Sequence, residues 1–175
     1  MHSYWLKSDF SLFHLNIRSL NKNGDELCQF LNTINCDFDV LVLSETWSCN
    51  VTYFSNLISG YNFYYDLPDS SNVWGVGIYV RSTLLYNIVD VYKISSSSEC
   101  RVENLWLEVT KGCSQYIIGR IYRYPGHRIT FTEKFDNVLS QISHYKLPCL
   151  IAGDINIDLK NFKLTLTLRP ITEQF

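Results

Sequence analysis

Short apolar runs separated by polar segments organise the first fifty residues of the chain. Residues 10–16 form a nearly continuous apolar run, the pattern of a strand that is covered on both faces. The polar stretch 17–24 predicts a loop, and Asn23 with Glu26 three residues later predicts the start of a helix. The apolar face of this helix consists of Leu27, Phe30, Leu31 and Ile34. A second apolar run at 40–43 completes a strand–helix–strand unit with a layered α/β core, although a strand inserted between the two is an alternative.

The middle of the chain has the pattern of β-structure. Alternating or β-branched runs at 61–65, 76–80 and 84–91 are separated by turn-rich segments and predict three strands. Two longer runs, 102–110 and 115–122, flank the turn sequence KGCS and predict a hairpin.

A helix and a further strand follow the hairpin. Thr130 and Glu133 have the spacing of a capping box, which predicts a helix start. The apolar face of that helix consists of Phe131, Phe135, Val138, Leu139 and Ile142. The apolar run 147–152 predicts a buried strand, and the leucines within 164–168 alternate as they would in a terminal strand.

The segment Gly153-Asp154-Ile155-Asn156-Ile157-Asp158 directly follows this apolar run. Because side chains alternate along a strand, Asp154 and Asn156 are expected on the same face. A carboxylate and a neutral amide side by side suit the binding of a metal-bound water against a phosphate. The alternative is an Asx-rich turn at the end of a strand, because Gly, Asp and Asn are also the commonest turn residues.

The composition indicates one globular domain, because 175 residues of which 46% are apolar can bury a substantial core. A formal net charge of −2 gives no global signature of nucleic-acid binding, so any polyanion contact must be local or supported by a cation. The six cysteines include no C-x-x-C pair, which argues against a zinc site, and Cys149 has the setting of a buried thiol. Scattered cysteines indicate an intracellular protein, and the N-terminal residues, with Lys7 and Asp9, fit neither a signal peptide nor a membrane span.

Four predicted strands end in polar side chains. These side chains are Asn16, Glu45, Tyr122 and the pair Asp154 and Asn156. In layered α/β folds ligands gather outside the strand ends, so we expect these residues to share a cleft. One Glu and one Asp with two Asn would form a hard-oxygen site suited to Mg²⁺ or Mn²⁺.

Taken singly, these residues have simpler interpretations. Glu45 would serve equally as the acid of a helix N-terminus, and Tyr122 is one of 12 tyrosines that would more often lie in a core or at its rim. Tyr122 and Arg123 are, however, effective donors to phosphate oxygens. The coincidence of four strand ends favours the joint functional interpretation.

Six short segments occur in a recognisable order. They are HLNIRSL (14–20), LSETW (43–47), GVGIYV (75–80), ENLWL (103–107), IYR (121–123) and GDINID (153–158). Together they resemble the endonuclease/exonuclease/phosphatase superfamily, most closely the abasic-site-endonuclease-like domain of non-LTR retrotransposons. The resemblance implies an α/β (α+β) fold, a four-layer αββα sandwich, and metal-dependent cleavage of phosphodiesters.

The resemblance also implies a role for each site residue. Glu45 would be the main metal ligand, and Asn16 would support the metal or the phosphate. Asp154 would orient or deprotonate the attacking water. The cofactor would be Mg²⁺ or Mn²⁺, which neutralises charge on the phosphate.

Other residues of these segments would contact the phosphate. Asn156 would help to hold the phosphate and its transition state, and Tyr122 would contact it as well. Arg123 is expected to be an additional phosphate contact, whereas Asp158 is interpreted as structural.

The end of the chain departs from the family pattern. The family continues to a second acidic residue and an Asp-His pair, whereas no histidine follows His144 here. We therefore expect an N-terminal extension at 1–9, an incomplete family domain at 10–160 and a divergent tail at 161–175. The second sheet would then lack its last strands and leave an exposed edge. Loss of the histidine would make the activity weak or absent.

The favoured function is a Mg²⁺-dependent endonuclease of retrotransposon type that nicks DNA, in the nucleus or the cytoplasm. Its parent polyprotein would carry a reverse transcriptase, and no membrane partner is expected. One alternative is a non-catalytic remnant that binds metal or polyanion. Another is a phosphatase or phospholipase of the same superfamily, which the NIRSL sequence at 16–20 disfavours.

Overall fold

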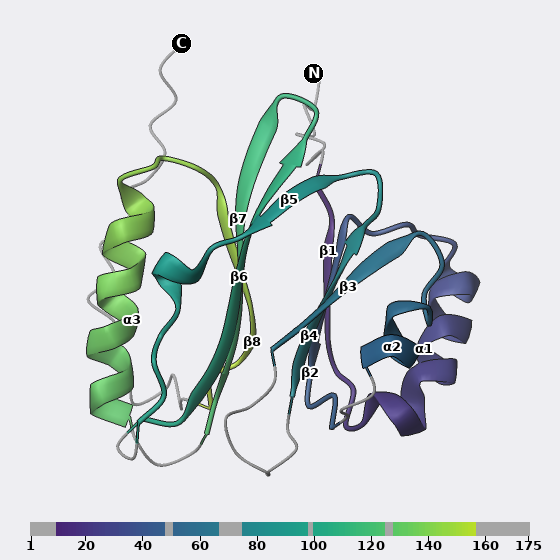
Figure 1. Cartoon of the computed structure of the whole chain (residues 1–175), viewed down its shortest axis with the longest axis horizontal. Coiled ribbons are helices and arrows are strands. Elements are labelled where there is room, and N and C mark those ends of the chain that lie inside the picture. Colours follow the sequence, from purple (N-terminus) through teal and green to yellow (C-terminus); the bar gives the residue numbers. More distant parts are fainter. Residues whose placement is uncertain (1–9, 48–50, 67–74, 98–99, 125–127, 157–175) are drawn as a thin grey trace, which may run out of the picture.

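Four layers, in the order helices, sheet, sheet, helix, make up the described part of the chain (Figure 1). The computed structural model describes residues 10–47, 51–66, 75–97, 100–124 and 128–156. This arrangement confirms the predicted αββα sandwich. The predicted extension at 1–9, the tail at 161–175 with its alternating leucines, and Asp158 lie outside the described residues.

The first half of the chain builds one sheet and the helices that cover its outer face. Its elements are β1 (Leu12–Asn16), α1 (Leu20–Ile34), β2 (Val40–Ser44), α2 (Val51–Ser55), β3 (Tyr61–Asp66) and β4 (Val76–Arg81). The strand order is β1-β2-β4-β3, with β1 parallel to β2 and β4 antiparallel to both of its neighbours. The predicted strand–helix–strand unit is confirmed, and β1 and β2 are direct neighbours without an inserted strand.

The second half builds the other sheet and its single covering helix. Its elements are β5 (Leu85–Ile88), the short 3-10 helix η1 (Asp90–Tyr92), β6 (Val102–Lys111), β7 (Ser114–Arg123), α3 (Arg128–Ser143) and β8 (Cys149–Asp154). The order is β5-β6-β7-β8, and β8 lies parallel to β7 because α3 carries the chain back between them. The predicted hairpin is confirmed, whereas the strand expected at 84–91 ends at Ile88 and turns into η1.

The stretch predicted as a loop at 17–24 is largely helical. Helix α1 begins at Leu20, and the hydroxyl of Ser19 caps it by accepting a hydrogen bond from the Lys22 N–H at 3.3 Å. Asn23, the predicted cap, lies inside the helix and donates its side-chain amide to the Ile17 carbonyl at 2.7 Å. The prediction was wrong because bonds to a distant segment, the end of β2, hold the start of this helix.

Side-chain alternation divides the apolar residues among three layers. The layer between the sheets includes Val42, Ile78, Leu107 and Ile118. Leu27, Leu43 and Phe54 pack beneath α1 and α2. Trp106, Ile121 and Phe131 pack between the second sheet and α3. Most of the strands therefore contribute to two layers, which is why a one-residue shift in register would be costly.

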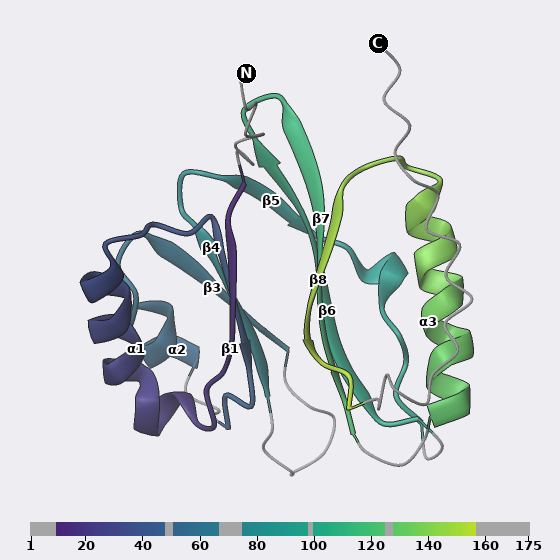
Figure 2. The same ribbon diagram turned by 180° about the vertical axis from the view of Figure 1, so that it is seen from behind.

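Strands β1 and β8 lie at the edges of their sheets on the same side of the sandwich and contact each other (Figure 2). Leu150 and Ile151 of β8 are each 38% exposed. Strand β8 is therefore an edge of the second sheet in the described part of the chain, and the expected loss of later strands stays a prediction. None of the helices described here is long and apolar enough to cross a bilayer.

A buried carboxylate ties the two sheets together at the end where β1 and β2 begin. Asp39 Oδ2 accepts hydrogen bonds from the Ser11 N–H at 2.7 Å and from Lys111 Nζ, at the end of β6, at 2.9 Å. Burial raises the pKa of Asp39, but the bonds from Lys111 and Ser11 outweigh this and leave the pKa below its ordinary value. The native state therefore favours the ionised form.

We expect Asp39→Asn to destabilise the fold at pH 7 by roughly 1–3 kcal/mol, because Lys111 would lose its charge partner. A carboxylate whose pKa is lowered in the native state contributes stability above its unfolded pKa and loses it as the pH falls through the native value. The difference between wild type and variant should therefore shrink from pH 7 towards pH 3 in urea unfolding experiments. Asp136→Asn, at an exposed carboxylate of α3, is the control. A difference that stays constant across this range would contradict the assignment.

Candidate active site

The layer between the two sheets is apolar along most of its length and polar where the parallel strands end. One sheet contributes His14, Asn16 and Ser44 to this polar end, and the other contributes Glu103, Arg120, Tyr122 and Asp154, as side-chain alternation requires. Strand register places Tyr122 between Glu103 on one side and Asp154 on the other. Strand β8 contacts both β1 and β2 across the layer. The structure thus brings the ends of β1, β2, β7 and β8 together.

Asn16 and Glu45 form a pair at the ends of β1 and β2. The Asn16 amide donates to Glu45 Oε1 at 2.7 Å. The other polar side-chain atom, Asn16 Oδ1, is buried and has no hydrogen-bond partner among the described residues. Glu45 has a φ of 55°, a left-handed conformation that is unfavourable for this residue type. Its carbonyl accepts from the Ser19 N–H at 2.8 Å, which helps to hold the strained turn.

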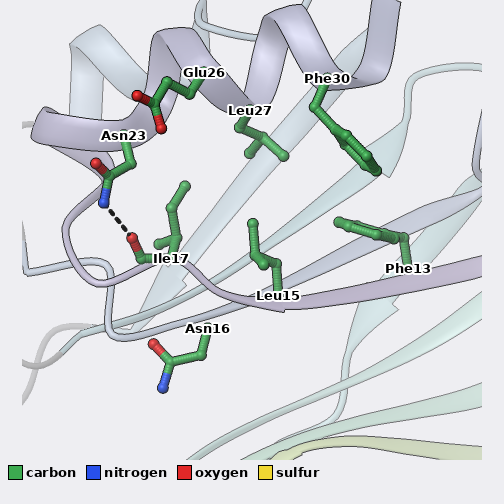
Figure 3. Close-up of a pocket in the computed structure, with 8 residues that line it drawn as sticks. All are labelled: Phe13, Leu15, Asn16, Ile17, Asn23, Glu26, Leu27 and Phe30. Carbon is green, nitrogen blue, oxygen red and sulfur yellow. Dashed lines mark hydrogen bonds between the residues drawn. The ribbon is translucent and has the colours of Figure 1, made fainter. Parts of the chain in front are cut away.

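A neighbouring cavity of about 400 Å³ lies under α1 on the opposite face of β1 (Figure 3). Its lining residues are Phe13, Leu15, Asn16, Ile17, Asn23, Glu26, Leu27 and Phe30. In Figure 3, Leu15 and Ile17 point towards α1, whereas Asn16 points away from it. The Asn16 side chain therefore faces the other sheet, although Asn16 also borders this cavity.

Tyr122 lies among carboxylates from both sheets. Its side chain is 6% exposed. Burial raises the pKa of Tyr122, the negative charges of Glu45, Asp154 and Glu103 raise it further, and Arg120 partly offsets them. The phenol therefore keeps its proton above the pH at which an ordinary tyrosine ionises, and it can act as a hydrogen-bond donor.

Asp154 and Asn156 are joined by a turn rather than by a strand face. Strand β8 ends at Asp154, and the Asn156 N–H donates to Asp154 Oδ1 at 3.0 Å. Asn156 has a φ of 48°, and its side-chain amide donates to the Arg123 carbonyl at 2.8 Å. The prediction that strand alternation aligns the two residues was wrong, because the chain leaves the strand between them. The turn interpretation describes the backbone correctly, and the turn brings the Asn156 backbone N–H to the Asp154 carboxylate.

Arg123 holds this turn through hydrogen bonds to its backbone carbonyls. Its side chain is 3% exposed, and the guanidinium donates to the Ile155 carbonyl at 2.6 Å and to the Asn156 carbonyl. Gly153 is also required here, since a Cβ would lie 1.9 Å from the Ile121 carbonyl oxygen. The structure gives Arg123 a role in holding the turn, and its contact with phosphate stays a prediction.

Four residues of the polar end were not identified as site residues from the sequence: His14, Ser44, Glu103 and Arg120. Arg120 is fully buried, donates to the Glu103 carbonyl at 3.3 Å and lies 5.8 Å from the centre of the Tyr122 ring. His14 Nε2 lies 3.0 Å from Ser44 Oγ, and burial, then Arg120, lowers the pKa of His14 against a smaller opposing effect of Asp154. The signal that could have found Arg120 is a charge inside an apolar run, two residues before Tyr122 and so on the same face.

The donor set at the strand ends fits a hard cation that keeps most of its water. Within the described residues no group of three or more His, Cys, Asp or Glu side chains is placed to hold a metal by itself. Glu45 with the buried Oδ1 of Asn16 offers one carboxylate and one amide oxygen. Mg²⁺ is commonly bound by one or two carboxylates together with water and substrate phosphate, and this set matches that pattern.

Comparison with known proteins gives a family match. A sequence profile of the endonuclease/exonuclease/phosphatase family matches residues 13–168. Among curated protein sequences none matches the chain significantly.

Several solved structures share the fold at low sequence identity. D. rerio TDP2 complexed with single strand DNA product is 19% identical with a TM-score of 0.62, and the match covers 85% of this chain and 61% of that chain. The endonuclease domain of TRAS1, a telomere-specific non-LTR retrotransposon, is 12% identical with a TM-score of 0.64, covering 86% and 62%. A mannosyl-6-phosphatase of Bacteroides thetaiotaomicron is 14% identical with a TM-score of 0.60, covering 85% and 66%. The present chain thus spans 61–66% of the length of these three proteins.

We expect Arg123→Lys to loosen the turn that carries Asp154 and Asn156. A lysine ammonium cannot span two carbonyls as the planar guanidinium does, and removing a charge-assisted hydrogen bond costs roughly 1.5–3 kcal/mol. Denaturant unfolding should show this destabilisation, and hydrogen exchange at the Asn156 amide should accelerate. Lys146→Arg, at an exposed position, is the control and should change neither measurement. Wild-type exchange at Asn156 in the Arg123→Lys variant would contradict the proposed role.

Proposed function

The chain belongs to the endonuclease/exonuclease/phosphatase family, and on this premise we propose that it is an intracellular, metal-dependent phosphodiesterase that nicks DNA. The proposal rests chiefly on the Asn16–Glu45 pair at two strand ends, where a buried amide oxygen, without a hydrogen bond from the part of the chain that the structure describes, lies beside a carboxylate. DNA as the substrate is supported by two structural relatives, TDP2 with its single strand DNA product and the TRAS1 endonuclease domain. The retrotransposon assignment further implies a reverse transcriptase in the parent polyprotein.

Glu45 and Asn16 Oδ1 would hold a Mg²⁺ or Mn²⁺ ion, with water and a phosphate oxygen in the other positions. Such a cation neutralises charge on the phosphate and makes the attacking water easier to deprotonate. Arg120 lies behind the site and reduces the electrostatic cost of gathering Glu45, Glu103 and Asp154 around Tyr122.

Side chains at the ends of β7 and β8 would take the proton of the attacking water and bind the phosphate. Asp154 Oδ1 accepts the Asn156 N–H, which orients the carboxylate so that Oδ2 can receive a proton from the attacking water. The water oxygen forms its bond to phosphorus as the bond to the leaving oxygen breaks, and that oxygen departs with the bonding electron pair and takes up a proton from solvent. Tyr122 donates its hydroxyl proton to a phosphate oxygen in a hydrogen bond. Asn156 gives one amide hydrogen to the Arg123 carbonyl and would use the second on the phosphate.

We expect Glu45→Ala and Asp154→Asn each to reduce Mg²⁺-dependent nicking of supercoiled plasmid by about 10²–10⁴-fold, the range for loss of a positioned acid–base group. The wild-type rate should fall to background in EDTA and recover with added Mg²⁺ or Mn²⁺. Glu45→Ala should also weaken Mn²⁺ binding followed by electron paramagnetic resonance, whereas Asp154→Asn should change it less.

Lys146→Ala, at an exposed residue beyond the end of α3, controls for effects of purification. Equal nicking by the wild type and both site variants would identify a contaminating nuclease. Hydrolysis of a soluble phosphomonoester without any cleavage of DNA would instead favour a phosphatase. Metal or DNA binding without turnover would favour the non-catalytic alternative.

A further prediction concerns the pH dependence of the Tyr122 contribution. Because the pKa of Tyr122 is raised above its ordinary value of 10.0, more than half of the hydroxyl groups stay protonated at pH 10, where an ordinary tyrosine is half ionised. The ratio of nicking rates between wild type and Tyr122→Phe should therefore fall by less than about twofold from pH 7 to pH 10. A ratio that falls towards one as the pH approaches 10 would show that the phenol ionises normally and would contradict the arrangement described above.

A further inference from the structure

The candidate site is acidic, although the proposed substrate is a polyanion. Glu45, Glu103 and Asp154 gather around Tyr122, and the two arginines of β7 lie behind them. Arg120 is fully buried, and Arg123 is 3% exposed with its guanidinium on the turn. A bound cation would compensate at one phosphate only, so neighbouring phosphates of a nucleic-acid strand need positive charge at the surface of the site.

One exposed arginine at this end of the molecule comes from the first sheet. Arg18 lies two residues after Asn16, and its two neighbours are fixed to the end of β2. The Ile17 N–H donates to the Ser44 carbonyl at 3.0 Å, and the Ser19 N–H donates to the Glu45 carbonyl at 2.8 Å. Arg18 has a φ of 47°, so the backbone is held in an unfavourable conformation beside the Glu45 turn.

A second exposed arginine comes from the other sheet. Arg101 directly precedes β6, and its carbonyl accepts from the Tyr124 N–H at 3.1 Å. Its guanidinium lies 4.6 Å from the centre of the Tyr124 ring, while the Tyr124 hydroxyl donates to Glu103 Oε1 at 2.6 Å. The Tyr124 ring in turn contacts the Tyr122 ring edge-on at 5.2 Å. The ring of Tyr124 therefore connects Arg101 to Tyr122 of the candidate site.

Stacking suits Arg101 for binding a phosphate. A guanidinium that lies over an aromatic ring keeps its N–H donors in its own plane, where they can bind two phosphate oxygens at once. Arg18 and Arg101 form no salt bridge with other described residues. Each lies at the end of the sandwich where β1 and β7 finish, one on either sheet.

We infer that Arg18 and Arg101 bind backbone phosphates on either side of the phosphate that is cleaved, and that they select a nucleic-acid strand over a small phosphate ester. The inference rests on the proposed function, because it places the cleaved phosphate between the strand ends of the two sheets. It assigns polymer selectivity to residues that do not take part in the chemistry.

The test compares two phosphodiester substrates, plasmid DNA and bis(p-nitrophenyl) phosphate, of which only the DNA has neighbouring phosphates. We expect Arg18→Ala/Arg101→Ala to raise the KM for plasmid nicking by about tenfold or more and to lower the slope of log affinity against log salt by about 2, roughly 0.9 for each phosphate that is no longer bound. Hydrolysis of bis(p-nitrophenyl) phosphate, a phosphodiester with no neighbouring phosphates, should stay within about twofold. Each single variant should show a smaller salt effect, and Arg18→Lys/Arg101→Lys should recover part of the plasmid activity.

Lys146→Ala removes one positive charge at an exposed position beyond Ser143, the last residue of α3, and controls for net charge in the single variants. Equal reductions on both substrates would overturn the inference, because the arginines would then act in folding or in the chemistry. An unchanged salt slope would overturn it as well. If the wild type cleaves neither substrate, the proposed function fails, and fluorescence anisotropy with a labelled oligonucleotide still decides the inference. Equal binding by the wild type and the double variant would then refute it.

Discussion

The face-to-face packing of two sheets is the constraint on which the rest of this structure depends. Every inner-facing residue must fit a layer shared with a strand from the other half of the chain. Apolar side chains such as Val42 and Ile118 fill the middle of that layer, and the Asp39–Lys111 pair closes one end of it. At the other end the inner-facing positions are polar. The same strand register that builds the core therefore places Asn16 and Asp154 at this end of the layer between the sheets. Stability and the candidate site therefore share one geometrical requirement.

Both turns that carry the central carboxylates contain a residue in the left-handed conformation. Glu45 has a φ of 55°, which costs of the order of 1–3 kcal/mol in a residue of this type, and Asn156 has a φ of 48°, which asparagine tolerates better. The first turn is fixed by backbone hydrogen bonds from the start of α1, and the second is fixed by the Arg123 guanidinium. This pattern of local strain compensated by distant bonds is common at sites where side chains must be preorganised. It also explains why Arg123 lies beneath the turn.

Much of the fold follows from local patterns. Apolar alternation predicted the strand–helix–strand unit, the hairpin of β6 and β7, and the strand that enters Gly153, because burying those residues requires these elements and little else. The start of α1 was missed because Ser19 and Leu20 are held by carbonyls at the end of β2, which lie more than twenty residues away in the sequence. The relation of Asp154 to Asn156 was predicted wrongly for a similar reason. The bonds that end β8 and fold the turn come from Arg123, on another strand.

The sequence by itself therefore determined the class of the fold, the family to which the chain belongs, and the strand ends at which polar residues gather. Those properties depend on periodicity and on short motifs, which are local. Only the tertiary structure decided which polar groups face the site and which support it. Arg120 and Glu103 face the layer between the sheets, Arg123 turns towards a backbone turn, and Arg18 and Arg101 stay at the surface. The physical reason is that the direction and ionisation of a charged side chain are set by partners brought near it in folding, and no local pattern records them.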